Sequence, residues 1–329
     1  MEAEESVPRG GDVAFEARVR AHRAVDSGFS RLTAAAAALV LVLLGGVVAA
    51  LALGAAPALG RFGWGFLAST AWNPVTGRFG ALPALAGTLV TSAIAMLVAI
   101  PLSFGVAFFL TELCPHRLRR PVGTAVELLA AIPSIIYGIW GLFVLAPLMQ
   151  AQVEPLLIRL AGPLPLVGAL FRGAPYGIGL LTAGLVLGGM VLPYAATVMR
   201  DAFEQVPATF RESAYALGCT RLEVVRAVVI PYSRRGVIGG VMLGLGRALG
   251  ETMAVTFVIG NAHRLPSSLL APGTTIAATL ANEFTEASDG LYTSALLALG
   301  LVLLGVSLAV LATAKVILRR SDMTGGGPR

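Results

Sequence analysis

The sequence predicts an all-α, polytopic membrane protein with about six transmembrane helices and a helical cytoplasmic loop. Of its 329 residues, 56% are hydrophobic and only 13% are charged, which is too apolar for an ordinary soluble protein of this length. The apolar residues gather in runs that can cross about 30 Å of hydrocarbon at about 1.5 Å per residue. The basic residues collect between these runs, mostly on one predicted side of the membrane.

Six apolar runs are long enough to be transmembrane helices. They extend over residues 32–53, 82–110, 128–149, 177–199, 236–260 and 291–314. The first run follows a long polar segment that contains several acids, so we interpret it as a retained helix and not as a cleaved secretory signal. Pro101, Pro133 and Pro193 fall within three of the runs, and each predicts a kink because proline removes a backbone donor.

The distribution of basic residues predicts the orientation, because cytoplasmic loops carry an excess of Lys and Arg. One side carries Arg9, Arg18, Arg20, Arg23, Arg31, Arg117, Arg119, Arg120, Arg200, Arg211, Arg221, Arg226, Arg234, Arg235, Lys315, Arg319, Arg320 and Arg329. The opposite side receives only Arg61, Arg78, Arg159, Arg172 and Arg264. Both termini are therefore predicted to be cytoplasmic, and the net charge of +6 is a topology signal that does not favour nucleic-acid binding.

Local motifs for metal, disulfide and nucleotide chemistry are missing from the sequence. The three histidines lie in separate polar segments without ligand spacing, so no metal site is predicted. Cys114 and Cys219 fall in predicted cytoplasmic segments, where thiols stay reduced. A phosphate-binding P-loop needs Gly-Lys-Ser/Thr, and Lys315, the single lysine, follows an alanine. We therefore expect no cofactor on this chain, and ATP must be used by another subunit if it is used at all.

The long loop over residues 200–235 mixes charge with helical periodicity, so we expect it to be structured. It contains Glu212-Ser213-Ala214, Gly218 four residues later, and Val228-Val229-Ile230-Pro231 after nine more. This spacing resembles the EAA loop of ABC-importer permeases, with mild departures at three positions. The resemblance implies that Glu212, Ala214 and Gly218 couple the loop to a separate ATPase. A generic amphipathic loop is the alternative.

The fifth apolar run carries a glycine stripe and two charges. Gly236, Gly240 and Gly244 recur at every fourth position, which predicts close helix packing. Arg247 and Glu251 are predicted to continue this face. An unpaired charge near the bilayer centre costs about 2.5–3.5 kcal/mol, so Arg247 is expected to face a pathway or a partner. We interpret the two residues as an anion checkpoint in a translocation pathway; a buried ion pair that fixes helix register is the alternative.

Three further segments sharpen the resemblance, namely residues 131–147, 246–261 and 272–284. They are similar to the phosphate-specific branch of the type I ABC-importer permease family, a CysTW-like group. The similarity extends from about residue 82 to the last helix. It implies a permease core over 82–318 that includes the coupling loop. Outside this core, composition and charge predict a cytoplasmic tail over 1–31, a first helix with a periplasmic loop over 32–81, and a disordered end over 319–329.

The resemblance implies a permease subunit of an ATP-driven phosphate importer that has no catalytic residues of its own and lies in the bacterial inner membrane. Its implied partners are a homologous permease, a dimer of ATPase subunits, a phosphate-binding protein, inorganic phosphate and the lipid bilayer. Other functions stay open at this point. A guanidinium cannot distinguish phosphate from sulfate, and a gated anion channel, a membrane scaffold or a phosphate-status sensor would also carry some of these features.

Overall fold

The computed structural model describes residues 10–165 and 168–324, with side chains for residues 26–165 and 168–316. Every regular element in these ranges is helical, which confirms the predicted all-α class. The α-helices are α1 Gly10–Phe62, α2 Gly65–Ala68, α3 Leu82–Phe108, α4 His116–Ala130, α5 Ser134–Trp140, α6 Ala146–Leu148, α7 Glu154–Ala161, α8 Leu180–Glu204, α9 Ala208–Ala216, α10 Arg221–Val224, α11 Ile230–Gly250, α12 Met253–Val258, α13 Ile276–Glu283 and α14 Gly290–Thr324. The π-helical turns are η1 Phe109–Leu113, η2 Gly141–Leu145, η3 Met149–Val153 and η5 Val225–Val229, and η4 Gly168–Phe171 is a 3₁₀ turn.

Five helical segments of the described chain are long and apolar enough to cross a membrane. They are Asp26–Phe62, Leu82–Leu113, Ser134–Ala161, Leu180–Glu204 and Gly290–Val316. Four of them overlap predicted runs with small shifts at their ends. The third begins later than predicted, because α4 ends at Ala130 and α5 starts at Ser134, after the turn that contains Pro133.

The predicted fifth run over residues 236–260 is not one helix. It consists of the last part of α11 and all of α12, with Glu251 in an extended conformation (φ −70°, ψ 130°) between them. Hydropathy alone missed this break, because apolar residues continue on both sides of it. The interruption places irregular backbone beside Arg247, at a depth where such backbone must be covered by protein or lie in a water-filled space.

The prolines within the longest helices are accommodated without ending them. Pro101 lies inside α3 and Pro193 inside α8, and both helices continue past them. Only Pro133 coincides with a helix boundary. Pro101 and Pro193 therefore do not end their helices, and the kinks predicted at these two positions stay predictions.

The chain divides into two units, Met1–Leu53 and Gly54–Arg329. In the first, the described residues belong to α1. It begins at Gly10, so residues 10–31 of the predicted tail are helical and residues 1–9 lie outside the described residues. At the other end of the chain, α14 extends past the predicted core boundary at residue 318. Residues 325–329 of the predicted disordered end also lie outside the described residues.

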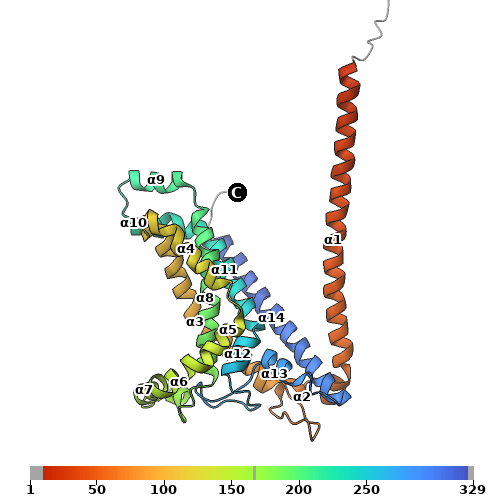
Figure 1. Cartoon of the computed structure of the whole chain (residues 1–329), viewed down its shortest axis with the longest axis vertical. Coiled ribbons are helices and arrows are strands. Elements are labelled where there is room, and N and C mark those ends of the chain that lie inside the picture. Colours follow the sequence, from red (N-terminus) through yellow and green to blue (C-terminus); the bar gives the residue numbers. More distant parts are fainter. Residues whose placement is uncertain (1–9, 166–167, 325–329) are drawn as a thin grey trace, which may run out of the picture. The chain divides into compact units, whose positions relative to one another are not determined.

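The second unit holds three apolar clusters, and α3 contributes to each of them. A central cluster joins α3, α8 and α12 around Leu187, Val191 and Val258. A second joins the end of α1 to α13 and α14 around Phe66, Phe79 and Leu296, and a third joins α3, α8 and η5 around Phe203. Within this unit, α9 and α10 lie at one end and α2, α7 and α13 at the other (Figure 1).

The predicted glycine stripe packs directly on α8. A Cβ atom added to Gly236 would lie 2.4 Å from Cβ of Ala202, and one added to Gly244 would lie 3.0 Å from a methyl group of Val191. The small-residue face therefore allows α8 and α11 to approach more closely than larger side chains would permit. The residue that continues this buried face is Ala248, because Arg247 is exposed.

Candidate functional site

The loop after α8 folds into two short helices, α9 and α10, joined by a tight turn at Gly218. Gly218 has φ +87°, a left-handed conformation that strains any residue with a Cβ atom. No atom lies within 4 Å of the position that its Cβ would take, so the requirement for glycine is conformational and not spatial. The amide of Cys219 donates to the carbonyl oxygen of Ala214 at 3.2 Å and so closes the end of α9.

The second loop helix starts with a capping box. The amide and hydroxyl of Thr220 both donate to a carboxylate oxygen of Glu223, at 2.7 and 2.8 Å. The hydrogen bond from the Thr220 amide holds the pKa of the Glu223 carboxyl below its ordinary value. The sequence therefore specifies both ends of the turn, with Gly218 ending α9 and Thr220 starting α10.

An ion pair ties α9 to the rest of the unit. Arg211 donates from Nη1 to Oε1 of Glu112 at 2.6 Å and from Nη2 to the carbonyl oxygen of Phe203 at 2.7 Å. The Glu112 side chain is 8% exposed and that of Arg211 is 21% exposed, so the pair is partly shielded from water. The contact has no local sequence signal, because the two residues lie 99 positions apart.

Four large apolar side chains of the two loop helices and of the turn between them are exposed. Tyr215, Leu217, Leu222 and Phe210 are exposed by 44%, 85%, 67% and 52%, and we call these four side chains the loop-helix surface. Such a group of exposed apolar residues marks a protein-interaction site. Glu212 is exposed beside it, whereas Ala214 is buried at 8% and faces the chain's own interior. The small size of Ala214 therefore serves the packing of α9 itself.

Arg247 lies in the last turn of α11, where the partial negative charge of the helix end favours a cation. Its guanidinium carbon lies 5.7 Å from the centre of the Tyr194 ring on α8, a cation–π contact. In the part of the chain that the structure describes, no carboxylate forms an ion pair with Arg247. The guanidinium is exposed and keeps its hydrogen-bond donors available for an anion.

Glu251 does not lie one turn above Arg247 on a continuous helix. α11 ends at Gly250, and Glu251 Oε1 accepts a hydrogen bond from the amide of Ala254 at 3.3 Å, at the start of α12. The prediction that Arg247 and Glu251 share one helix face is therefore wrong, because the Glu251 side chain caps the next helix, α12. Arg247 and Glu251 still lie close together in the chain, with Arg247 just before the break between α11 and α12 and Glu251 within that break.

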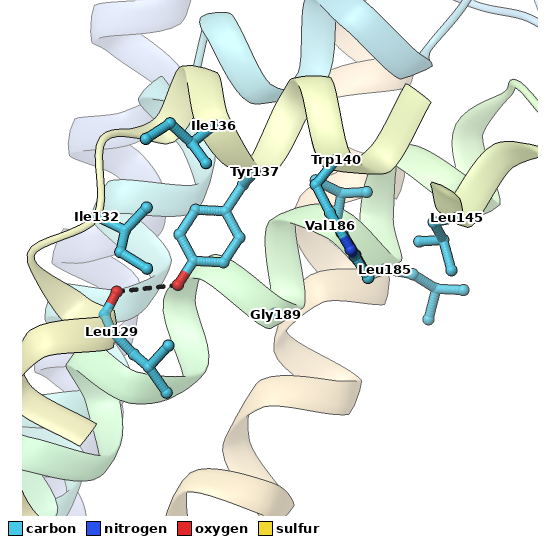
Figure 2. A pocket seen from close by; sticks show the side chains of 9 residues that line it. All are labelled: Leu129, Ile132, Ile136, Tyr137, Trp140, Leu145, Leu185, Val186 and Gly189. Atoms are coloured by element: carbon cyan, nitrogen blue, oxygen red, sulfur yellow. Dashed lines mark hydrogen bonds between the residues drawn. The ribbon is translucent and has the colours of Figure 1, made fainter. Parts of the chain in front are cut away.

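An apolar groove of about 560 Å³ lies between α5 and α8 (Figure 2). Its lining residues are Leu129, Ile132, Ile136, Tyr137, Trp140, Leu145, Leu185, Val186 and Gly189. The Tyr137 hydroxyl, the main polar group in it, donates to the carbonyl oxygen of Leu129 at 2.9 Å. A groove with this lining does not suit an anion; it suits lipid chains or the apolar side chains of another membrane subunit.

A polar cluster ties together segments at the end of the unit opposite α9 and α10. Glu283 accepts hydrogen bonds from Trp72 Nε1 at 2.8 Å and the Tyr292 hydroxyl at 2.6 Å, and its other oxygen lies 2.5 Å from His263 Nε2. Burial acts to raise the pKa of Glu283, but the hydrogen bonds from His263, Tyr292 and Trp72 outweigh it and leave the pKa below its ordinary value. We call these four residues the loop cluster. Local sequence gave no signal for it.

Comparison with known proteins identifies the family. Residues 99–322 match the family described as "Binding-protein-dependent transport system inner membrane component". The chain is 59% identical to the phosphate transport system permease protein PstC of Mesorhizobium japonicum, over 94% of this chain and 95% of that protein. It is 53% identical to the protein of the same name from Pasteurella multocida, over 93% and 95%. A probable PstC of the archaeon Methanocaldococcus jannaschii is 37% identical over 88% of this chain and 91% of that protein.

Solved structures support the same fold. A bacterial alginate ABC transporter in complex with an alginate-bound periplasmic protein aligns with a TM-score of 0.56 at 18% identity, over 88% of this chain and 96% of that one. An inward-facing methionine ABC transporter aligns with a TM-score of 0.51 over 73% and 94%. At this identity the likeness concerns the fold alone. Together these findings show that the chain belongs to the family of inner-membrane components of binding-protein-dependent transport systems.

Proposed function

We propose that this chain is a permease subunit of an ATP-driven phosphate importer and forms half of the translocation pathway. The observation that carries the proposal is its high identity, over nearly the whole chain, to bacterial permeases named for phosphate transport. Inorganic phosphate is a tetrahedral oxyanion, and a guanidinium binds such an anion with two parallel hydrogen bonds. Arg247 is the substrate-pathway residue that we assign to this contact.

The break between α11 and α12 supports this assignment. Transport proteins place substrate sites at discontinuous membrane helices, where backbone groups lie free of the helical hydrogen-bond ladder. Arg247 lies at this break with no carboxylate partner among the described residues. Glu251, the second pathway residue, adds a negative charge at the same break and so limits how tightly an anion is held. Bound phosphate can then leave toward the cytoplasm.

The loop-helix surface is the docking site that we propose for a separate ATPase. Its exposed apolar side chains would fit a cleft on a PstB-like subunit, and Arg211 would transmit the movement of that subunit to the core through Glu112. Glu212 and Gly218 serve this coupling in different ways, with Glu212 as an exposed contact and Gly218 as the turn. ATP is bound and hydrolysed by the partner, and this chain performs no catalysis.

The complete importer would contain two permeases, this chain and a PstA-like homologue, with a PstS-like protein that delivers phosphate on the opposite side from the ATPases. The apolar groove between α5 and α8 suits the homologous permease, because its lining is mostly apolar. We propose that the end of the second unit that carries α9 and α10 is cytoplasmic, as are both termini. The excess of arginines in these segments supports this orientation, because cytoplasmic loops are rich in Lys and Arg.

The test is uptake of labelled phosphate by vesicles that hold the complete complex, with ATP inside and sulfate as competitor. We expect ATP-dependent uptake that sulfate does not inhibit and that Arg247→Ala abolishes while the complex still assembles. Arg159→Ala, which removes an exposed arginine of α7, is the matched control and should transport normally. Competition by sulfate would identify a different oxyanion importer, flux without ATP would identify an anion channel, and normal uptake by Arg247→Ala would refute the assigned role.

A further inference from the structure

A small pocket lies between two loops at the end of the second unit opposite the loop helices. Its volume is about 240 Å³, and it is formed by residues 172–176, which precede α8, and residues 264–271, which precede α13. Since one water occupies about 30 Å³, the pocket has room for a tetrahedral oxyanion together with several waters. It is separate from the break that carries Arg247.

The polar groups of this pocket are all suited to an anion. Arg172 and Arg264 both line it, together with Tyr176 and Ser267, and no acidic residue does. In the described chain, neither arginine side chain has an ion pair or a hydrogen bond, and both are exposed. Arg200, by contrast, pairs with Glu127 at 2.7 Å. Two unneutralised guanidinium groups beside one pocket create a positive potential that attracts anions.

Hydrogen bonds between the two loops fix the walls of the pocket. The carbonyl oxygen of Leu170 accepts from the Ser268 hydroxyl at 2.9 Å and from the Leu269 amide at 2.8 Å. The Leu269 carbonyl in turn accepts from the amide of Leu181 at 2.8 Å, near the start of α8. Ser268 is buried at 5%. The pocket is therefore held in shape before any ligand binds, which lowers the entropy cost of binding.

We propose that this pocket, which we call the two-arginine pocket, binds a tetrahedral oxyanion on the extracytoplasmic side, before it reaches Arg247. The inference rests on the proposed function, because it places the pocket on the side from which phosphate enters. Arg172 and Arg264 bind the anion from the two loops, and the Tyr176 and Ser267 hydroxyls complete its hydrogen bonds. Because both arginines are open to water, binding is weak, as an entry site requires if the anion is to move on.

Chemical protection tests binding directly. Phenylglyoxal modifies accessible arginines, and mass spectrometry reports the rate at each position in the purified complex without its binding protein. At about ten times its dissociation constant, inorganic phosphate should slow modification of Arg172 and Arg264 about tenfold relative to chloride at the same ionic strength, because only the unoccupied fraction of the pocket reacts. Arg159, on the same predicted side but outside the pocket, should be modified at an unchanged rate. Equal rates with phosphate and chloride at both pocket arginines would overturn the proposal.

Transport kinetics separate an entry site from a docking contact. The double variant Arg172→Gln/Arg264→Gln should lower the maximal rate of phosphate uptake about tenfold, while the concentration of binding protein that gives half-maximal uptake stays constant. The Arg172→Lys/Arg264→Lys variant should restore part of the rate, and Arg159→Gln should match the wild type. A raised half-maximal concentration with an unchanged maximal rate would show instead that the arginines dock an acidic face of the binding protein.

The same assay distinguishes failure of this inference from failure of the proposed function. If the wild-type complex takes up no phosphate, the proposed function fails. If the wild type takes up phosphate and the glutamine double variant does so with identical kinetics, the two-arginine pocket has no part in transport and only this inference falls.

Discussion

Breaking the ion pair between Arg211 and Glu112 should release α9 from the core. The pair measures 2.6 Å between Nη1 and Oε1, and Glu112 is only 8% exposed, so the interaction is stronger than a fully exposed surface pair. A hydrogen bond to a charged group contributes about 1.5–3 kcal/mol. Because Arg211 is about a fifth exposed, we take about 2 kcal/mol, which raises the opening equilibrium of α9 about 30-fold.

The two partners should not be equivalent. Arg211→Met removes both the contact with Glu112 and the hydrogen bond to the carbonyl of Phe203, whereas Glu112→Gln removes only the negative charge. We therefore expect the larger effect from Arg211→Met. The double variant should be less destabilised than Arg211→Met alone, because Glu112→Gln removes the carboxylate that Arg211→Met leaves buried without a partner.

Hydrogen–deuterium exchange of the α9 amides in the purified complex measures this opening, and the number of ATP molecules hydrolysed per phosphate imported measures its effect on coupling. Arg211→Met should exchange about 30-fold faster over α9 and should hydrolyse more ATP per phosphate. Arg226→Met, an exposed arginine of η5, is the control. Unchanged exchange over α9 in Arg211→Met would refute the anchoring role.

Three further predictions concern single residues. Gly218→Ala should destabilise the turn by about 1–2 kcal/mol, because its φ of +87° is left-handed, and Gly218→Asn should cost less; circular dichroism melts and ATPase coupling would show whether this order holds. Glu283 has a lowered pKa in the folded state, so its contribution to stability is present above the ordinary carboxyl pKa and is lost as the pH falls through the folded-state pKa. The Tm difference between wild type and Glu283→Gln should therefore shrink below about pH 4.5. A Tm difference that does not depend on pH would contradict this. Glu154 is 1% exposed and accepts a hydrogen bond from the Gly177 amide at 3.0 Å. Glu154→Leu should leave that amide unpaired and lower Tm more than Glu154→Gln, which keeps an acceptor. Equal Tm values for the two variants would argue against this role of Glu154.

Much of the loop and the helix packing could be predicted because their signals are local. The turn between α9 and α10 depends on Gly218 and on the pair Thr220 and Glu223, which lie within a few residues of one another. The contact between α8 and α11 depends on glycines spaced one turn apart, and the structure confirms that contact. Spacing along the chain is enough for such features, because short-range backbone geometry decides them.

The contacts that sequence analysis missed join residues far apart in the chain. Trp72 and Glu283 lie 211 positions apart, and neither carries a local motif that would predict the loop cluster. The break at Glu251 was missed for a different reason. Hydropathy is averaged over a window of residues, so the apolar residues of α12 outweigh the single charged residue Glu251, whose carboxylate caps α12.

The glycine contacts between α8 and α11 bear on how a push on the cytoplasmic loop is passed inward. The segment that holds α9 and α10 leaves from the end of α8 and returns at the start of α11, so both of its ends are attached to the same tightly packed pair. With Gly236 and Gly244 leaving no space for either helix to shift against the other, the pair should tilt as one stiff lever. Its far end carries Arg247, so tilting the lever would change the surroundings of that arginine without any rearrangement within the pair.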